Sequence, residues 1–158
     1  TISQPYIVAL MTQALCLQGG EEVLEIGTGS GYAAAVLAEI AGRVTTIETI
    51  SGLAQHAEAL LTSLGYTNIQ VVHGDGTKGY SPNAPYDAIV VTAGGPEVPK
   101  SLKQQLKTGG RLVIPVGTST SFQSLVRVIR ESQDNFIYED ICDVRFVPLV
   151  GAEGWPVE

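Results

Sequence analysis

The chain has 158 residues, of which 44% are hydrophobic and 16% are charged. These values exclude a disordered or fibrous chain and predict a single globular domain, 1–158, with its own core. The net charge of −7 argues against a nucleic-acid partner, because the phosphate backbone would repel the domain as a whole. Since no apolar run approaches the length of a membrane span, we expect neither a membrane-bound protein nor a signal peptide.

The cysteines and histidines do not indicate a metal site. Cys16 and Cys142 have no metal-ligand spacing, and we therefore expect a reduced, cytoplasmic protein. His56 and His73 are similarly isolated. Both cysteines fall in apolar segments, which predicts that they belong to the core.

Apolar runs alternate with helical patterns along most of the chain. The expected elements, in chain order, are a helix at 5–17, a strand at 21–27, a helix at 32–42, a strand at 43–48, a helix at 51–65, strands at 69–74 and 86–93, a short helix at 99–106 and a strand at 110–117. Ser3 and Ser51 are the expected helix caps. Gly42 and Gly65 are the expected helix ends.

Strands that alternate with helices are typical of a parallel sheet covered on both faces. Residues 123–132 and 135–150 predict two or three further strands without an intervening helix. The expected fold is therefore α/β: a Rossmann-like, doubly wound, mostly parallel sheet with helices on both faces and an antiparallel C-terminal part. We expect Phe122, Phe136 and Phe146 to lie in its core. In such sheets ligands bind beyond the carboxyl ends of the strands.

A glycine-rich turn follows the first expected strand, in the segment VLEIGTGSGY. Gly27, Gly29 and Gly31 alternate, and the place of the third glycine of a dinucleotide fingerprint is taken by Tyr32. A P-loop is excluded more firmly, because no Gly-Lys-Ser/Thr follows. The glycines let the backbone approach a ligand closely and free the amides of the next helix.

Acidic residues follow the first three strands, at one edge of the expected sheet. The Glu48 carboxylate suits two ribose hydroxyls, because it can accept a hydrogen bond from each. Asp75 could accept from an adenine amino group, with Gly76 leaving room for the base. Glu25 stands beside the glycine turn, where it would repel a pyrophosphate and attract a cation. S-adenosylmethionine, which carries a sulfonium and an ammonium group, therefore fits better than NAD.

Each of these features also has a structural interpretation. A glycine turn can serve tight strand–helix packing, Glu48 can favour a helix dipole, and Asp75 can form an Asx turn. The structural interpretation needs three separate coincidences at three successive strand ends, whereas one site explains them together. We therefore interpret these residues as parts of one ligand-binding site.

Seven segments spread over nearly the whole chain resemble the protein-L-isoaspartate O-methyltransferases. They are TISQPY, VLEIGTGSGY, HGDG, APYDAIVVTA, PEVP, GGRLVIPVG and VRFVPL. The glycine turn alone would indicate only a class I methyltransferase, and the first and last segments are more specific. The resemblance implies methyl transfer from S-adenosylmethionine to the carboxylate of L-isoaspartyl residues in damaged proteins, leaving S-adenosylhomocysteine. The ester then collapses to a succinimide that partly reopens as normal aspartate, which is repair.

The resemblance also implies roles for individual residues. The implied cofactor contacts are Thr1, Ile2 and Ser3 along the cofactor, Ser30 near its methionine portion, Glu48 and Thr49 at its ribose, and Asp75 with Gly76 at its adenine. Ser3 is the implied active-site serine. A substrate carboxylate is already ionised at neutral pH and no histidine stands near Ser3, so we expect Ser3 to orient reacting groups without forming a covalent intermediate.

Two alternatives stay open. Another S-adenosylmethionine-dependent methyltransferase or an adenosine-cofactor oxidoreductase could use the same fold, and a non-catalytic domain could retain the pocket. Members of the family carry an N-terminal helical region before TISQPY, so we expect either a fragment or excised domain, or a protein without that region. We expect isoaspartyl peptides and proteins as partners, no nucleic acid or membrane, and a monomer.

Overall fold

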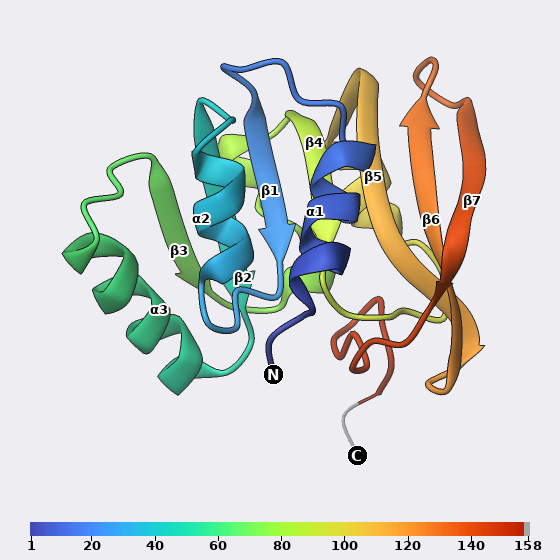
Figure 1. The fold of residues 1–158 in the computed structure, drawn as a ribbon. Coiled ribbons are helices and arrows are strands. Elements are labelled where there is room, and N and C mark those ends of the chain that lie inside the picture. Colours follow the sequence, from blue (N-terminus) through green and yellow to red (C-terminus); the bar gives the residue numbers. More distant parts are fainter. Residues whose placement is uncertain (157–158) are drawn as a thin grey trace.

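One sheet organises the protein, as Figure 1 shows for the computed structural model, which describes residues 1–156. In these residues the sheet has seven strands in the order β3-β2-β1-β4-β5-β6-β7. The strands are β1 (Glu22–Ile26), β2 (Arg43–Glu48), β3 (Ile69–His73), β4 (Tyr86–Val91), β5 (Leu106–Ser119), β6 (Phe122–Arg130) and β7 (Phe136–Val144). The first five run parallel, and β6 and β7 pair antiparallel. The expected mostly parallel sheet with an antiparallel C-terminal part is confirmed.

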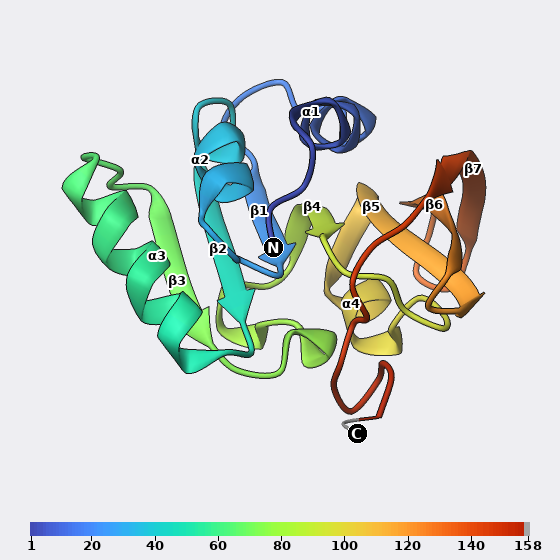
Figure 2. The ribbon, with the colours of Figure 1, turned by 60° about the horizontal axis from the view of Figure 1, so that its bottom comes forward.

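Helices cover both faces of this sheet. They are α1 (Pro5–Ala14), α2 (Tyr32–Ala38), α3 (Ser51–Ser63) and α4 (Lys100–Gln105), with the short 3-10 turns η1 (Gly76–Lys78) and η2 (Ser81–Asn83) before β4. Figure 2 shows α1, α2 and α3 on one side of the sheet and α4 on the other. Among the described residues, no helix combines the length and apolar character needed to cross a membrane.

The strand order reverses between β1 and β4. The chain passes from β1 outward through β2 to β3, and then returns to the other side of β1 to form β4. The loops that follow β1 and β4 therefore leave in opposite directions, which opens a crevice at the carboxyl ends of these two neighbouring strands. The N-terminus lies at this same edge (Figure 1).

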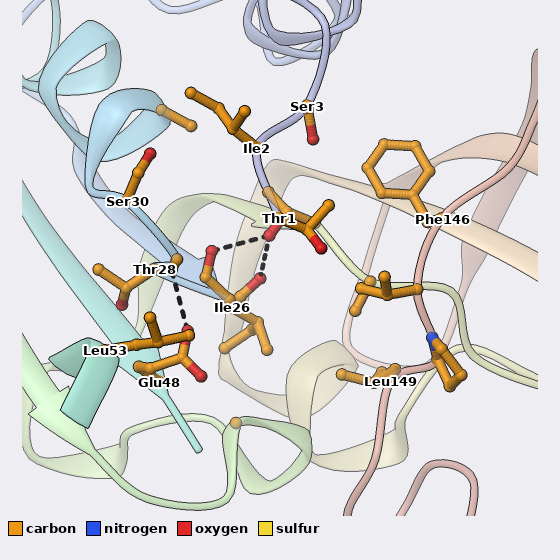
Figure 3. A pocket seen from close by; sticks show the side chains of 18 of the residues that line it. Thr1, Ile2, Ser3, Ile26, Thr28, Ser30, Glu48, Leu53, Phe146 and Leu149 are labelled. Carbon is orange, nitrogen blue, oxygen red and sulfur yellow. Dashed lines mark hydrogen bonds between the residues drawn. The ribbon is translucent and has the colours of Figure 1, made fainter. Parts of the chain in front are cut away.

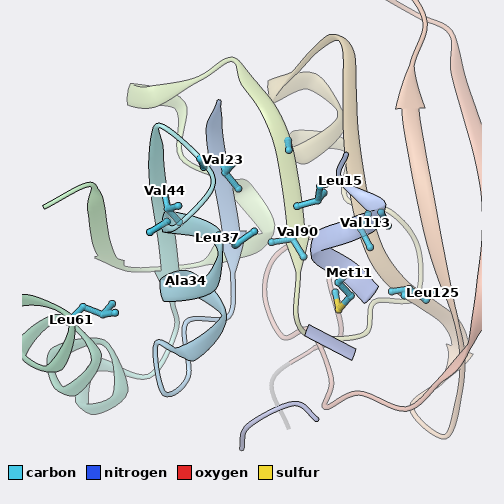
Figure 4. Close-up of a cluster of buried hydrophobic side chains, with 14 residues drawn as sticks. Met11, Leu15, Val23, Ala34, Leu37, Val44, Leu61, Val90, Val113 and Leu125 are labelled. Atoms are coloured by element: carbon cyan, nitrogen blue, oxygen red, sulfur yellow. The ribbon is translucent and has the colours of Figure 1, made fainter. Parts of the chain in front are cut away.

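Alternation along the strands builds two cores, one on each face of the sheet. On β1, Val23 packs toward α1 and α2, while Leu24 and Ile26 pack on the opposite face toward α4. Figure 4 shows the first cluster, in which Leu37 of α2 and Met11 of α1 lie against strand residues. Because the inner strands are covered on both sides, β1 and β4 bury apolar residues on both faces, as is usual for parallel sheets.

Two expected helix ends are wrong, and a third is confirmed. α1 ends at Ala14 instead of residue 17, and Cys16 lies beyond it, exposed and with a φ of 52°. Cys16 is therefore not a core residue, because the chain has already turned toward β1. α2 ends at Ala38, and Gly42 instead donates its N–H to the Glu21 carbonyl as the chain enters β2. α3 ends at Ser63, although Gly65, with a φ of 85°, still terminates it as expected.

The expected serine caps are also wrong. The residue before α1 is Gln4, and Pro5 begins the helix. Because proline has no backbone N–H, the first position of the helix has no donor that needs a capping acceptor. The residue before α3 is Ile50, and Ser51 lies inside the first turn, where its hydroxyl accepts from the Gln55 side chain.

The aromatic residues divide differently from expectation. Phe136 and Phe146 pack against the two cores and Cys142 is half-buried beside the first, as expected. Phe122 is 82% exposed, because it begins β6 at the tip of the β5–β6 hairpin, beyond the helices that cover the sheet. The expectation that Phe122 belongs to the core is wrong.

Two residues of β6 provide a direct test of this core. Leu125 is fully buried, so Leu125→Ala should lower the free energy of unfolding by about 2–5 kcal/mol through lost packing and a cavity. Phe122→Ala, on the same strand but exposed, should change it by less than about 0.5 kcal/mol. Urea denaturation of both variants measures the difference, and similar losses in the two would contradict this assignment of inside and outside.

Candidate functional site

A cavity of about 750 Å³ opens at the carboxyl ends of β1, β2 and β4, where the strand order reverses. Its volume falls within the range of small-molecule and cofactor sites. Of the residues implied by sequence, those in its lining are Thr1, Ile2, Ser3, Gly27, Gly29, Ser30, Glu48, Thr49 and Gly76. The structure thus gathers most of the predicted site residues around one space, from four separate parts of the chain (Figure 3).

The glycine turn after β1 needs its first glycine for a steric reason. Gly27 has a φ of 95°, and a Cβ at this position would collide with Thr92 Oγ1 at the end of β4. Thr92 Oγ1 lies 2.8 Å from the Gly27 carbonyl oxygen and 3.0 Å from that of Ile26, so its hydroxyl can donate to either. A side chain at Gly27 would push these neighbouring strand ends apart, so the glycine keeps the cavity floor closed.

The Glu48 carboxylate links the turn after β1 to the loop after β2. One oxygen accepts the Gly29 N–H at 2.9 Å, and the other accepts the Ile50 N–H at 3.0 Å. An ionised carboxylate offers about four acceptor positions, so two are left for ligand hydroxyls. Glu48 is 6% exposed and lies in the cavity lining, which suits a buried contact to a ribose.

The first residues of the chain form another wall of the cavity. A Cβ on Gly29 would lie 3.3 Å from the Thr1 carbonyl oxygen, so this segment passes directly beside the glycine turn. In the view of Figure 3, Ser3 lies on the side of the cavity away from Glu48, as does Phe146. The cavity therefore has a Glu48 end and a Ser3 end, which can serve two parts of a reacting pair.

Glu25 lies beneath the site and does not face it. Its side chain is fully buried, Oε2 accepts the Thr46 hydroxyl at 2.6 Å, and Oε1 has no hydrogen-bond partner among residues 1–156. Burial raises the pKa of Glu25 from its ordinary value of 4.5 to about 8; the Thr46 hydrogen bond opposes this rise, and the charge of Glu48 adds to it. The expectation that Glu25 presents a charge to the ligand is therefore wrong: at neutral pH it is a neutral acid inside the protein.

Asp75 lies just outside the cavity lining, and its carboxylate already accepts hydrogen bonds from the protein. Oδ1 accepts the N–H of Thr77 at 3.0 Å and its hydroxyl at 2.6 Å, while Oδ2 accepts the Ala152 N–H at 2.9 Å. Partial burial works to raise the pKa of Asp75, but these hydrogen bonds hold it below its ordinary value. The Asx turn considered from sequence is present. Gly76 is the residue of this loop that reaches the cavity, and the adenine contact of Asp75 stays a prediction.

Gly31 also lies outside the lining. It precedes α2 with a φ of 84°, and a Cβ there would crowd Leu61 of α3 at 3.3 Å. The third glycine of the turn thus permits close packing between two helices, which is the structural role considered for it.

The sequence did not predict two parts of the site. Thr92 lines the cavity from the end of β4, and residues 143–150 line it from the end of β7 onward. The quoted segment VRFVPL contained the second of these, but as a marker of resemblance without a position in space. Thr92 follows an apolar strand at its carboxyl end, and this same signal identified Glu48.

These features define the class of the protein: a Rossmann-like α/β domain of the methyltransferase type, with a glycine turn after β1 and an acid ending β2. A solved protein-L-isoaspartate O-methyltransferase has the same fold, with a TM-score of 0.90 and 32% identity over 97% of this chain. A solved SAM-dependent methyltransferase from Thiobacillus denitrificans, in complex with S-adenosyl-L-homocysteine, gives a TM-score of 0.59 and 26% identity over 71% of this chain and 48% of that one.

The chain belongs to the protein-L-isoaspartate(D-aspartate) O-methyltransferase family, whose model matches residues 1–154. Protein-L-isoaspartate O-methyltransferase 1 of Rhodopseudomonas palustris (strain HaA2) is 65% identical over 98% of this chain. The family predicted from the sequence is confirmed. The chain spans 63% of the length of that relative and 49% of the solved protein-L-isoaspartate O-methyltransferase.

The buried acid gives a pH prediction. Between pH 4.5 and 8 the unfolded chain releases the Glu25 proton while the folded protein retains it, so this group lowers the stability of the folded state as pH rises. Glu25→Gln removes the effect. The variant should therefore gain stability over the wild type by up to about 1.4 kcal/mol per pH unit in this window. Urea unfolding from pH 5 to 8 measures the gap, and a gap that stays constant with pH would contradict the neutral buried acid.

Proposed function

We propose that the protein is a protein-L-isoaspartate O-methyltransferase, which transfers a methyl group from S-adenosylmethionine to the carboxylate of L-isoaspartyl residues. The observation that carries the proposal is the meeting, in one cavity, of the Ser3 segment, the glycine turn, Glu48 and the segment after β7. These come from separate parts of the chain, and the Ser3 segment, the glycine turn and the segment after β7 each contain a motif that resembles the family. The partners are then damaged proteins and peptides, and the cytoplasmic setting expected from the sequence stays a prediction.

The donor set suits S-adenosylmethionine. The Gly27 turn lets the backbone close over a ligand, and the free acceptor positions of Glu48 suit the two hydroxyls of a ribose. Gly76 reaches the cavity beside Ile26, and because a Cβ there would collide with the Ile26 side chain, the glycine lets this loop pack closely against the end of β1. With Glu25 neutral, the acidic residues that line the cavity are Glu48 and Asp143, and Arg145 is the basic one.

The reaction needs little from the protein beyond holding the reacting groups in position. Bound S-adenosylmethionine supplies a methyl group attached to a sulfonium, which accepts the electron pair of the breaking S–C bond as the carboxylate oxygen forms its bond to the methyl carbon. The substrate carboxylate needs no general base, because its pKa near 4 leaves it ionised at neutral pH. The walls formed by Ser3 and Phe146 would hold this carboxylate in line and exclude water, which is the main source of rate in such a transfer.

The direct test is methyl transfer from labelled S-adenosylmethionine to an isoaspartyl peptide, compared with the same peptide containing normal aspartate. The full-length protein should methylate the first and not the second. Calorimetric titration with S-adenosylhomocysteine and with NAD separates a methyltransferase from an oxidoreductase. Binding of S-adenosylhomocysteine without methylation of the isoaspartyl peptide would leave a non-catalytic binding domain or a methyltransferase of other specificity, and would overturn the proposal.

Glu48→Ala should weaken S-adenosylmethionine binding by about 1–3 kcal/mol, because ligand hydroxyls and the Gly29 and Ile50 amides lose their acceptor. Glu58→Ala, which removes the same charge from an exposed position on α3, is the matched control and should bind normally. Titration calorimetry compares the two, with thermal unfolding measured alongside. Unchanged affinity in Glu48→Ala would remove the ribose assignment.

Ser3→Ala should lower the methylation rate of an isoaspartyl peptide by about 10- to 150-fold, the effect of losing one hydrogen bond to a charged group. Cofactor affinity should change much less, and Ser3→Thr should retain part of the activity because the hydroxyl remains. Steady-state kinetics with a mass-spectrometric search for modified serine gives the readout. A methylated Ser3 that forms and is then consumed during catalysis would contradict the orienting role. Wild-type rates in Ser3→Ala would show that Ser3 takes no part in the reaction.

A further inference from the structure

The segment after β7 leaves the sheet and becomes a wall of the cavity. β7 ends at Val144, and residues 145–150, here called the wall segment, line the cavity. Figure 2 shows the chain after β7 crossing from the edge of the sheet toward the carboxyl ends of β4 and β5. A segment outside the strand ladder needs other partners for its backbone, and those partners determine where the wall stands.

Gln123 supplies partners to both backbone groups of Phe146. Its Oε1 accepts the Phe146 N–H at 2.8 Å, and its Nε2 donates to the Phe146 carbonyl at 3.2 Å. Gln123 also pairs with Val144 in the β6–β7 ladder, so its side chain continues the ladder two residues beyond the point where β7 ends. The side chain is 5% exposed, and a lost bond there would leave a buried polar group without a partner.

The neighbouring loop after β4 is shaped to receive this side chain. A Cβ on Gly94 would collide with the Gln123 amide, so the glycine makes room for it. Gly94 itself donates to the Val147 carbonyl at 2.8 Å and accepts the Leu149 N–H at 2.8 Å. Gln123 and Gly94 together therefore fix three residues of the wall segment, Phe146, Val147 and Leu149.

We propose that Gln123 is a positioning residue for the peptide substrate: it sets the part of the wall segment around Phe146, which lies with Ser3 on the side of the cavity away from Glu48. The inference rests on the proposed function. The glycine turn and Glu48 are held by bonds among the loops after β1 and β2, so the Glu48 end does not depend on this amide. Loss of the amide should therefore act on peptide turnover and leave cofactor affinity nearly unchanged.

The chain offers a matched control for the test. Gln105, at the end of α4, also donates to a backbone carbonyl, that of Lys78 at 2.9 Å, and accepts a backbone N–H, that of Tyr80 at 2.8 Å. These bonds lie outside the cavity lining. Gln105→Leu removes the same two kinds of bond as Gln123→Leu, from a less buried position outside the cavity, so it controls for the loss of side chain–backbone bonds as such.

The experiment compares the wild type, Gln123→Leu and Gln105→Leu in the full-length protein, at a temperature where each is folded. We expect kcat/KM for an isoaspartyl peptide to fall by about 10- to 100-fold in Gln123→Leu, the effect of losing two neutral hydrogen bonds. The Kd for S-adenosylhomocysteine should change by less than about threefold, and Gln105→Leu should keep both quantities within about threefold of the wild type.

Gln123→Glu adds a readout that a packing role would not change. A protonated carboxyl can replace the amide, because its hydroxyl donates to the Phe146 carbonyl and its carbonyl accepts the Phe146 N–H. An ionised carboxylate has no proton to donate to the Phe146 carbonyl, and it places a negative charge beside that carbonyl oxygen. The activity of this variant, divided by that of the wild type at each pH, should rise as pH falls. The nearby charged side chains, Asp143 just before the wall segment and Arg145 at its start, are the same in both proteins, so the ratio cancels their effect.

The outcomes separate the two proposals. If the wild type methylates isoaspartyl peptides and Gln123→Leu behaves as Gln105→Leu does, the positioning role is overturned and the proposed function stands. A parallel loss of S-adenosylhomocysteine affinity, or a flat pH ratio for Gln123→Glu, would also overturn it. If the wild type methylates no isoaspartyl peptide, the proposed function fails and this inference fails with it. Should Gln123→Leu not fold, the pH ratio of Gln123→Glu decides.

Discussion

One carboxylate holds together the two loops on which the site depends. Glu48 accepts a backbone N–H from the turn after β1 and another from the loop after β2, so the distance between these loops is set by the width of a single functional group. The strands beneath them are rigid, because they are covered on both faces. A ligand that enters finds acceptors already oriented, and little conformational entropy is lost when it binds.

The sequence predicted the sheet, its helices and most of the cavity lining, because these follow from local periodicity and from the rule that ligands meet parallel strands at their carboxyl ends. The same rule indicates that Thr92, at the carboxyl end of β4, lies at this edge, but it does not reveal its partners. The hydrogen bonds of Thr92 with Ile26 and Gly27 arise from the proximity of β4 to β1, across 65 positions of sequence for Gly27, and no local pattern specifies which strands become neighbours. The same holds for Gln123, whose partner Phe146 is 23 positions away in an irregular segment.

The prediction for Glu25 was wrong, although the alternation of side chains along the strand already indicated its true position. Val23 and Leu24 face opposite sides of the sheet, and continued alternation places Glu25 on the side of Val23, under α2. The prediction placed it at the edge because it is acidic and stands beside the glycine turn. For Asp75 the sequence allowed both an Asx turn and a ligand contact, and the bond to Ala152 depends on a segment whose path no local pattern reveals.

The hydrogen bond between Asp75 and Ala152 spans 77 positions of sequence, and the hydrogen bond between Gly94 and Trp155 spans 61. Contacts this distant close large loops, and their entropic cost is recovered only when the sheet that brings them together already exists. The wall of the cavity therefore depends on the assembled sheet for its position. During synthesis the glycine turn and Glu48 emerge before the wall segment, so the wall segment can dock beside them only afterwards.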